Sequence, residues 1–320
     1  IPIHLAQAID GLFFDDHRYV WYTQGVYMTK SSFSLFEFQQ RYRTEQDCLR
    51  TIEKVRWPHG FICPKCEHHD GYRLHTRRVI ECVVCKYQSS ITAGTVFHKT
   101  KISLLKWFWA IYLIAQDKGG ISALRLSKQL DINFKTAWRI LHKIRRAMSR
   151  HDARTTYLSG VIELDEAFFG GKQRKTQVLV AIEKESNGAG HLVMKKIFGR
   201  GTSKPAIKRV VKAYVNNETK QHFVTDCAGA HSILVKMGHR LETYKSTPAS
   251  ATKHLPLVHL AISLAKTFLL GTYHGVSKKY LQRYLDEFCY RFNRRLKESS
   301  IYQNLIRTCV LIPPRFGYLH

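Results

Sequence analysis

The chain has 320 residues, with 51 Lys and Arg against 24 Asp and Glu, so its formal net charge at pH 7 is +27. Hydrophobic residues make up 44% and aromatic residues 12%, which is enough to form a core and excludes global disorder. Such an excess of positive charge is untypical of a metabolic enzyme and indicates a polyanionic partner, above all nucleic acid. The longest apolar run, Trp107–Ala115, has 9 residues. Because a membrane-spanning helix needs about 20, we predict no span.

Residues 1–32 are interpreted as an N-terminal arm, because they contain few basic residues and no clear hydrophobic period. Met28 precedes a polar stretch, so one hypothesis is that it is the natural start; the other is an ordinary N-terminal arm. Residues 33–60 have apolar side chains at helical spacing in two stretches. We expect two helices there, the second capped by Thr44 together with Asp47.

Residues 61–98 contain two C-x2-C pairs separated by 15 residues, a spacing typical of a structural zinc ribbon. Four thiolates leave no open coordination position, so the zinc is expected to be structural rather than catalytic. The alternative is four buried free cysteines. Neighbouring basic and aromatic residues suggest that the ribbon touches nucleic acid, although a merely solvated basic face has the same composition. The other four cysteines are scattered, which favours a reducing, cytoplasmic compartment. The predicted ligands are Cys63, Cys66, Cys82 and Cys85.

Residues 99–150 are predicted to be helical, and the second and third helices have the spacing of a helix-turn-helix. Ser103 is expected to begin the first helix and Asn133 to cap the third. Basic and polar residues near the start of the third helix would then face the DNA major groove. A helical hairpin that does not touch DNA has a similar pattern, so that alternative stays open. The expected helices are 103–117, 121–130 and 134–149, and the candidate DNA contacts are Lys135, Thr136 and Arg139.

From about residue 155 the pattern changes to strands, which predicts an α/β domain over 155–298 followed by a C-terminal tail over 299–320. Residues 243–256 are expected to be a loop, and the chain after it is expected to be helical. The predicted strands are 160–165, 177–184, 192–198 and 222–226, with a helix at 203–216 and the clearest late helix at 277–295.

Two aspartates lie at the ends of predicted strands in this domain. Alternation along the first strand places Val161, Glu163 and Asp165 on one face, and Asp226 ends another strand. Two carboxylates at neighbouring strand ends can hold Mg²⁺ ions, which would activate a hydroxyl nucleophile and stabilise the leaving oxygen of a phosphodiester. The alternative for each aspartate is a carboxylate that caps a turn.

The stretch Leu164–Lys172 resembles the first catalytic motif of bacterial insertion-sequence transposases of the DDE type, in the group with an N-terminal zinc ribbon and helix-turn-helix. Shorter matching stretches occur in the same order along the chain, and together they cover about residues 33–296. They are Phe38–Tyr42, Cys63–Cys66, Gly94–Phe97 and Gly271–Arg295.

This resemblance implies a multidomain α+β chain whose catalytic domain is ribonuclease-H-like with a mixed sheet. It implies that Asp165 and Asp226 bind Mg²⁺ or Mn²⁺ during strand cleavage and strand transfer at the ends of an element. The implied partner is double-stranded DNA with terminal inverted repeats. A homodimer or a larger synaptic assembly in the bacterial nucleoid is expected by the same analogy.

The third catalytic position departs from the family pattern. The slot of the usual glutamate falls near His259, that of the alternative asparagine near Leu264, and that of its lysine on Lys266. Leu264 cannot bind a metal, and an imidazole suits softer metals better than Mg²⁺. A catalytically decayed, transposase-derived DNA-binding protein is therefore the alternative function, with a stand-alone nuclease as a third. Further candidate DNA contacts are Lys172, Arg294 and Arg295, the two arginines being equally explained as a solvated helix end.

Overall fold

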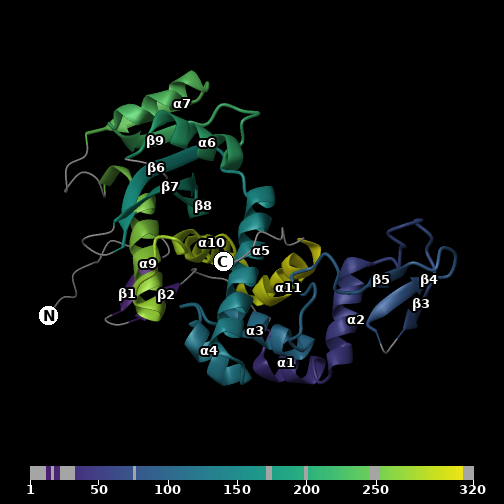
Figure 1. Cartoon of the computed structure of the whole chain (residues 1–320). Coiled ribbons are helices and arrows are strands. Elements are labelled where there is room, and N and C mark those ends of the chain that lie inside the picture. Colours follow the sequence, from purple (N-terminus) through teal and green to yellow (C-terminus); the bar gives the residue numbers. More distant parts are fainter. Residues whose placement is uncertain are drawn as a thin grey trace. The chain divides into compact units, whose positions relative to one another are not determined.

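The computed structural model describes residues 12–15, 18–21, 33–74, 77–170, 175–197, 201–245 and 253–312 (Figure 1). The chain divides into two compact units. The first contains Tyr157–Phe168 and Gln177–Ser263, together with the N-terminal hairpin of β1 (Leu12–Asp15) and β2 (Arg18–Trp21). The second contains Ser32–Thr156, Phe169–Thr176 and the chain from Leu264 onward. Met28 and Lys172, and with them the predictions made for those residues, lie outside the described ranges.

The first unit is built on a five-stranded sheet with the order β10-β9-β6-β7-β8. The central strand β6 pairs in parallel with β9, and β9 pairs in parallel with β10. Strands β7 and β8 are antiparallel to each other. The sheet is therefore mixed, as the sequence predicts. The strands are β6 (Val161–Phe169), β7 (Thr176–Glu185), β8 (Gly188–Lys196), β9 (His222–Asp226) and β10 (Arg240–Tyr244).

One face of this sheet is apolar and is covered by α6 (Lys204–Tyr214) and α7 (Ile233–Lys236) (Figure 1). Ile162 and Leu164 of β6 belong to this core. Because successive side chains of a strand point to opposite faces, Glu163 and Asp165 lie on the other face. The alternation that the sequence predicts for these residues thus separates a hydrophobic face from a carboxylate-bearing one.

The second unit is mainly helical around one core, and its described helices begin where the sequence provides capping residues. Thr44 and Asp47 form a reciprocal capping box at the start of α2, as predicted, and the side chains of Ser103 and Asn133 cap α3 and α5. The helices are α1 (Leu35–Arg41), α2 (Glu45–Arg56), α3 (Leu104–Gln116), α4 (Ala123–Leu130), α5 (Phe134–Thr155), α10 (Leu281–Phe292), η2 (Arg295–Ser300) and α11 (Ile301–Leu311).

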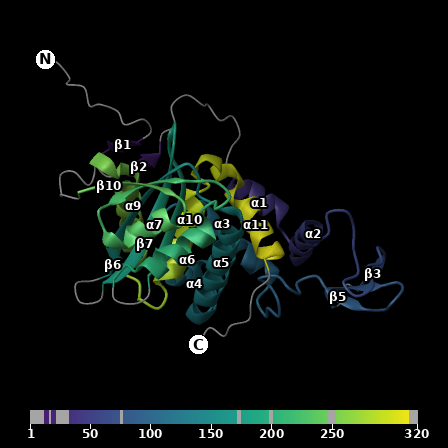
Figure 2. The same ribbon diagram turned by 90° about the horizontal axis from the view of Figure 1, so that it is seen from above.

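A small antiparallel sheet with the order β3-β4-β5 extends from this helical core beyond α2 (Figures 1 and 2). Its strands are β3 (Gly71–Leu74), β4 (Val79–Cys82) and β5 (Gln88–Ser90). The strands are short, and the fully buried residues among them are few, Ile80 and Ser89 besides Cys82. A sheet of this size has too little core to be stable by itself, so it needs a further cross-link.

Three elements differ from the sequence-based expectation. Residues 299–320 were expected to be a tail, yet α11 buries Tyr302, Leu305 and Cys309 in the core of the second unit. The expected loop at 243–256 instead includes the end of β10 and the start of α9 (Pro256–Tyr273). Helix α9 is apolar on most sides, so it lacks the clear amphipathic period on which helix prediction depends. Every helix of the described residues is too short or too polar to cross a membrane.

Candidate functional site

The two predicted metal-binding aspartates lie side by side where the pairing between β6 and β9 ends, Asp165 within β6 and Asp226 as the last residue of β9. The parallel register of β6 and β9 runs from Val161 opposite His222 to Leu164 opposite Thr225, and Asp165 and Asp226 are the next residues of each strand. Neighbouring strands are about 4.8 Å apart, so the two carboxylates share one small region. The parallel register of β6 and β9 therefore places Asp165 next to Asp226.

The electrostatics of Asp165 reflect that proximity. Burial raises the pKa of Asp165, and the negative charge of Asp226 raises it further. The backbone N–H of Glu166 opposes this by donating to Asp165 Oδ1 at 2.7 Å. A buried carboxylate beside a like charge is stabilised by a bound cation, which removes the repulsion and replaces lost solvation.

His259 is the residue of α9 that approaches these carboxylates. Its Nε2 lies 3.8 Å from Asp165 Oδ2, and this nitrogen is buried without a hydrogen-bond partner among the described residues. An unpartnered buried nitrogen beside a carboxylate is a donor arrangement that a divalent cation completes. The structure thus brings together three of the four predicted catalytic residues, namely Asp165, Asp226 and His259.

A hydrogen bond from the backbone of α9 to Glu163 holds the start of this helix next to β6. This side chain is 1% exposed, and its Oε2 accepts the backbone N–H of Val258 at 2.9 Å. The first N–H groups of a helix have no partner within the helix, and a carboxylate both satisfies them and favours the helix dipole. Burial raises the pKa of Glu163, while the N–H groups of Val258 and Leu257 lower it in part. Glu163 therefore fixes the helix one residue before His259.

The remaining predicted residues of α9 lie further along the helix. Lys266 is exposed and follows His259 by seven residues, so it is about 10.5 Å farther along the helix axis. Leu264 is buried, with 9% of its surface exposed. The catalytic role of Lys266 stays a prediction.

Two residues of the site were missed by the sequence analysis. His231, in η1 (Gly229–Ser232), is fully buried with its Nε2 3.1 Å from Glu166 Oε1 and its Nδ1 3.2 Å from Asp226 Oδ1. Burial lowers the pKa of His231, but Glu166 and Asp226 outweigh it and raise the pKa overall. Glu166 follows Asp165 and points to the opposite face of the sheet. No sequence period connects it with a histidine 65 positions later.

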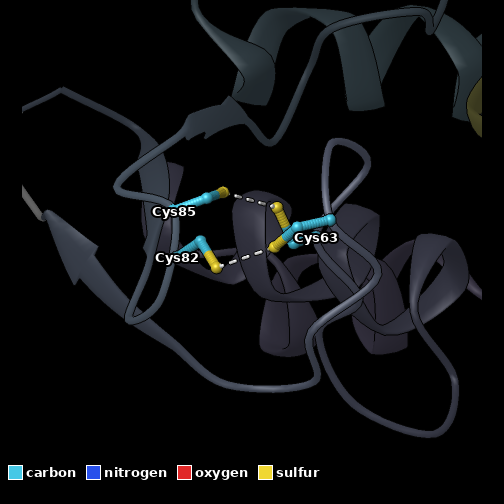
Figure 3. A group of neighbouring side chains, drawn as sticks. Cys63, Cys82 and Cys85 are labelled. Carbon is cyan, nitrogen blue, oxygen red and sulfur yellow. Dashed lines mark hydrogen bonds between the residues drawn. The ribbon is translucent and has the colours of Figure 1, made fainter.

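The zinc-ribbon cysteines converge from two tight turns. Cys63 Sγ lies 3.5 Å from Cys85 Sγ, and Cys66 Sγ lies 3.6 Å from Cys82 Sγ (Figure 3). All four sulfur atoms lie within 4.8 Å of one another. A tetrahedral zinc site with bonds of about 2.3 Å separates its sulfur atoms by about 3.8 Å, so these residues fit the ion. The four-cysteine group fits structural zinc, as the spacing predicts.

The thiol of Cys63 is prepared for metal binding. Burial raises its pKa, but the backbone N–H groups of Lys65 and Cys66 and the neighbouring thiols lower it to about 7. Only the thiolate coordinates zinc, and a lowered pKa reduces the cost of deprotonation at neutral pH. The turns of the two C-x2-C pairs supply these N–H groups, which links the local backbone to the chemistry of the site.

The predicted DNA-contact residues are placed in different environments. Lys135 and Arg139 are exposed near the start of α5, whereas Thr136 is half-buried. Arg294 pairs with Asp152 at 2.8 Å and is largely buried, and Arg295 donates to the carbonyl of Phe292. The short turn between α4 and α5 agrees with the predicted helical pair. Its recognition of DNA stays a prediction.

Comparisons with known proteins give two family matches. The model of the ISXO2-like transposase domain matches residues 157–293, and that of the transposase zinc-ribbon domain matches residues 43–88. An uncharacterised protein in transposable element ISH50 of Halobacterium salinarum is 29% identical over 128 residues, which are 39% of this chain and 42% of that relative.

Solved structures give weaker matches. The Mos1 transposase catalytic domain with raltegravir and Mn is 15% identical, with a TM-score of 0.27 over 55% of this chain and 94% of that chain. An intasome of simian T-cell lymphotropic virus is 15% identical, with a TM-score of 0.30 over 55% of this chain and 66% of that chain. These scores are too low to assign a role to any residue.

The two family matches lie in the order that the sequence predicts, with the four-cysteine group inside the first match and the mixed sheet with Asp165 and Asp226 inside the second. The match to the transposase domain therefore follows the match to the zinc ribbon along the chain. The chain thus carries a stretch that matches the transposase zinc-ribbon domain, followed by one that matches the ISXO2-like transposase domain.

Proposed function

We propose that this chain cleaves and joins DNA strands at the ends of an insertion sequence, and that Asp165, Asp226 and His259 form its catalytic metal site. The observation that carries the proposal is that Asp165 is flanked by Asp226 on the paired strand and by His259 of α9. Asp165 and Asp226 follow the last paired residues of β6 and β9, and His259 Nε2 is 3.8 Å from Asp165. Glu163 supports this arrangement by holding the start of α9.

The residues fit a divalent cation through their donor set. Two carboxylates provide hard oxygen ligands, and the unpartnered imidazole nitrogen of His259 provides a borderline one. This combination favours Mn²⁺ over Mg²⁺, because imidazole is a poor ligand for Mg²⁺. When bound, the metal would activate the attacking hydroxyl group and stabilise the leaving oxygen of a phosphodiester.

The protein's own side chains would perform the remaining tasks. Asp165 and Asp226 hold the cation at fixed positions, because both belong to backbone that is hydrogen-bonded within the sheet. Lys266, exposed two turns after His259, is suited to a phosphate contact rather than to metal binding. The net charge of +27 holds the DNA backbone and increases the rate of association.

The test is a cleavage and strand-transfer assay on DNA that carries the element's own ends, with Mg²⁺ or Mn²⁺. We expect the wild-type chain to cut and join, with higher activity in Mn²⁺, and Asp165→Asn to bind DNA without cutting. If the wild type binds but does not cut, and Leu264→Asn restores cutting, the chain is a decayed transposase that acts as a DNA-binding protein. Cutting without joining would identify a nuclease.

We infer further that the start of α5 contacts DNA through Lys135 and Arg139. Both are exposed on the first two turns, and Lys143 in the same helix is instead directed at the ring of Trp107. Each phosphate contact that is lost should reduce the dependence of binding on salt by about one unit in the log–log slope. Binding of Lys135→Ala and Arg139→Ala across a salt series tests this, with Lys212→Ala of α6 as a control from the other unit.

A further inference from the structure

The imidazole of His231 lies between two carboxylates that belong to different strands. Its Nε2 is 3.1 Å from Glu166 Oε1, and its Nδ1 is 3.2 Å from Asp226 Oδ1. The ring is 0% exposed. A fully buried imidazole with a carboxylate at each ring nitrogen is held in one orientation, because rotating the ring breaks both contacts.

The two contacts use different ring nitrogens, and this determines what the cluster can do. The three residues have donor atoms within 4.8 Å of one another. However, Nδ1 and Nε2 of one imidazole diverge, so a single cation cannot replace both contacts. The arrangement is a bridge between Glu166 and Asp226 rather than a cage around an ion.

The bridge selects one oxygen of Asp226. Asp226 Oδ1 also accepts the backbone N–H of Ala228 at 3.1 Å. Within the described part of the chain, both contacts of this carboxylate involve Oδ1, so Oδ2 is the oxygen available to a cation shared with Asp165. Glu166 in turn anchors the imidazole from the opposite face of the sheet, where the hydroxyl of Thr202 also contacts its carboxylate.

We propose that His231 is a positioning residue that fixes the carboxylate of Asp226, with Glu166 as its anchor, so that Oδ2 is presented to the catalytic cation. The inference rests on the proposed metal site at Asp165 and Asp226. Groups that hold the orientation of a metal ligand affect metal affinity without touching the metal. His231 holds Asp226 through an ion-pair contact at Nδ1 and is itself held by the hydrogen bond between Nε2 and Glu166. His231 and Glu166 thus extend the site through the sheet to its other face.

The experiment measures Mn²⁺ affinity by calorimetry and the nitrogen coupling of bound Mn²⁺ by pulsed electron paramagnetic resonance, on the full chain. We expect His231→Leu to weaken Mn²⁺ binding about 10- to 100-fold. His231→Asn should recover part of that loss, because its amide N–H occupies the place of Nδ1–H. Glu166→Gln should weaken binding less than His231→Leu. The nitrogen coupling, which comes from His259, should persist in all three variants.

His222→Leu is the matched control. His222 is on the same strand as Asp226 and pairs with Glu242 at 2.9 Å, but at the opposite end of β9. Its Mn²⁺ affinity should equal that of the wild type. Circular dichroism of each variant establishes that it is folded, and Glu166→Gln keeps the imidazole in place if His231→Leu does not fold.

Two results would overturn the inference. Equal affinities for His231→Leu, His231→Asn and the control would show that the ring only fills space. Loss of the nitrogen coupling in His231→Leu but not in His259→Glu would show that His231 is itself a metal ligand. These results can be distinguished from a failure of the proposed function. If the wild-type chain binds Mn²⁺ but cuts no DNA, the proposed function fails, while the comparison of Mn²⁺ affinities among the variants still tests the role of His231.

Discussion

His259 Nε2 lies 3.8 Å from Asp165 Oδ2, so the start of α9 places an imidazole beside the first of the two aspartates. The contact exists because Glu163, two residues before Asp165 on the same strand face, accepts the N–H of Val258 at the start of α9. Strand alternation and a helix N-terminus therefore combine to bring together residues that are 94 positions apart in the sequence.

The first prediction concerns the choice of metal. His259→Glu replaces a nitrogen donor by a carboxylate, so it should increase Mg²⁺-supported cleavage relative to Mn²⁺-supported cleavage by about tenfold or more. Initial rates of strand cleavage in each metal measure this ratio. His254→Glu is the control, because His254 lies five residues before His259 and stacks on the ring of Tyr244. An unchanged ratio in His259→Glu would place His259 outside the metal site.

The second prediction concerns zinc. Cys82→Ser should remove the bound zinc and unfold the small sheet β3–β5, because that sheet buries few apolar side chains of its own. Zinc content by atomic absorption and proteolysis within residues 61–98 report the two effects. Cys227→Ser, an exposed cysteine of the first unit, should keep one zinc per chain. Full zinc content in Cys82→Ser would contradict the four-thiolate site.

The third prediction concerns pH and His142. Burial, together with the charge of Arg145, lowers the pKa of His142 from 6.5 to about 3, and both ring nitrogens lack hydrogen-bond partners. The unfolded chain therefore binds one more proton than the folded chain between these values. The free energy of unfolding should fall by up to about 1.4 kcal/mol per pH unit as the pH decreases from 6.5 towards 3.

His142→Phe tests this because it removes the titrating group and keeps an aromatic ring beside Trp138 and Tyr280. Denaturant unfolding at pH 7 and pH 5 should show a smaller loss of stability in the variant than in the wild type. Equal losses in the two proteins would mean that His142 does not contribute to the acid sensitivity.

The fourth prediction concerns the buried ion pair of the second unit. Arg145 and Glu287 contact each other at 2.7 Å, with side chains that are 1% and 0% exposed. Glu287→Ala leaves the guanidinium buried without its principal partner and should cost about 3–5 kcal/mol of unfolding free energy. The exposed pair of Arg125 and Asp117 is the control, and Asp117→Ala should cost less than about 1 kcal/mol. Similar costs for both would contradict the burial argument.

Much of the fold could be predicted where one residue pattern implies one local structure. The cysteine spacing predicts the ribbon, Thr44 and Asn133 predict helix starts, and strand alternation predicts the separate faces of β6. The late helix could be predicted only in part. Glu287 was expected to be structural and to pair with Arg283 or Arg291; it contacts Arg291, but its shortest contact is to Arg145, 142 positions earlier.

Residues that depend on tertiary packing could not be predicted. Glu166 points away from Asp165, and only the turn after β9 brings His231 to it, so neither residue belongs to a motif of its own. Helix α9 is apolar on most sides, and for that reason it has little amphipathic signal. A hydrophobic period appears in the sequence only where an element has one buried side and one side exposed to solvent.

The most direct test of the account is an anomalous-scattering map from crystals of the full chain grown with Mn²⁺. The account predicts a manganese peak bonded to Asp165, Asp226 Oδ2 and His259 Nε2, with His231 still between Glu166 and Asp226 Oδ1. A manganese peak bonded to Glu166 and His231, or no peak at the ends of β6 and β9 in a chain that cleaves DNA, would contradict it.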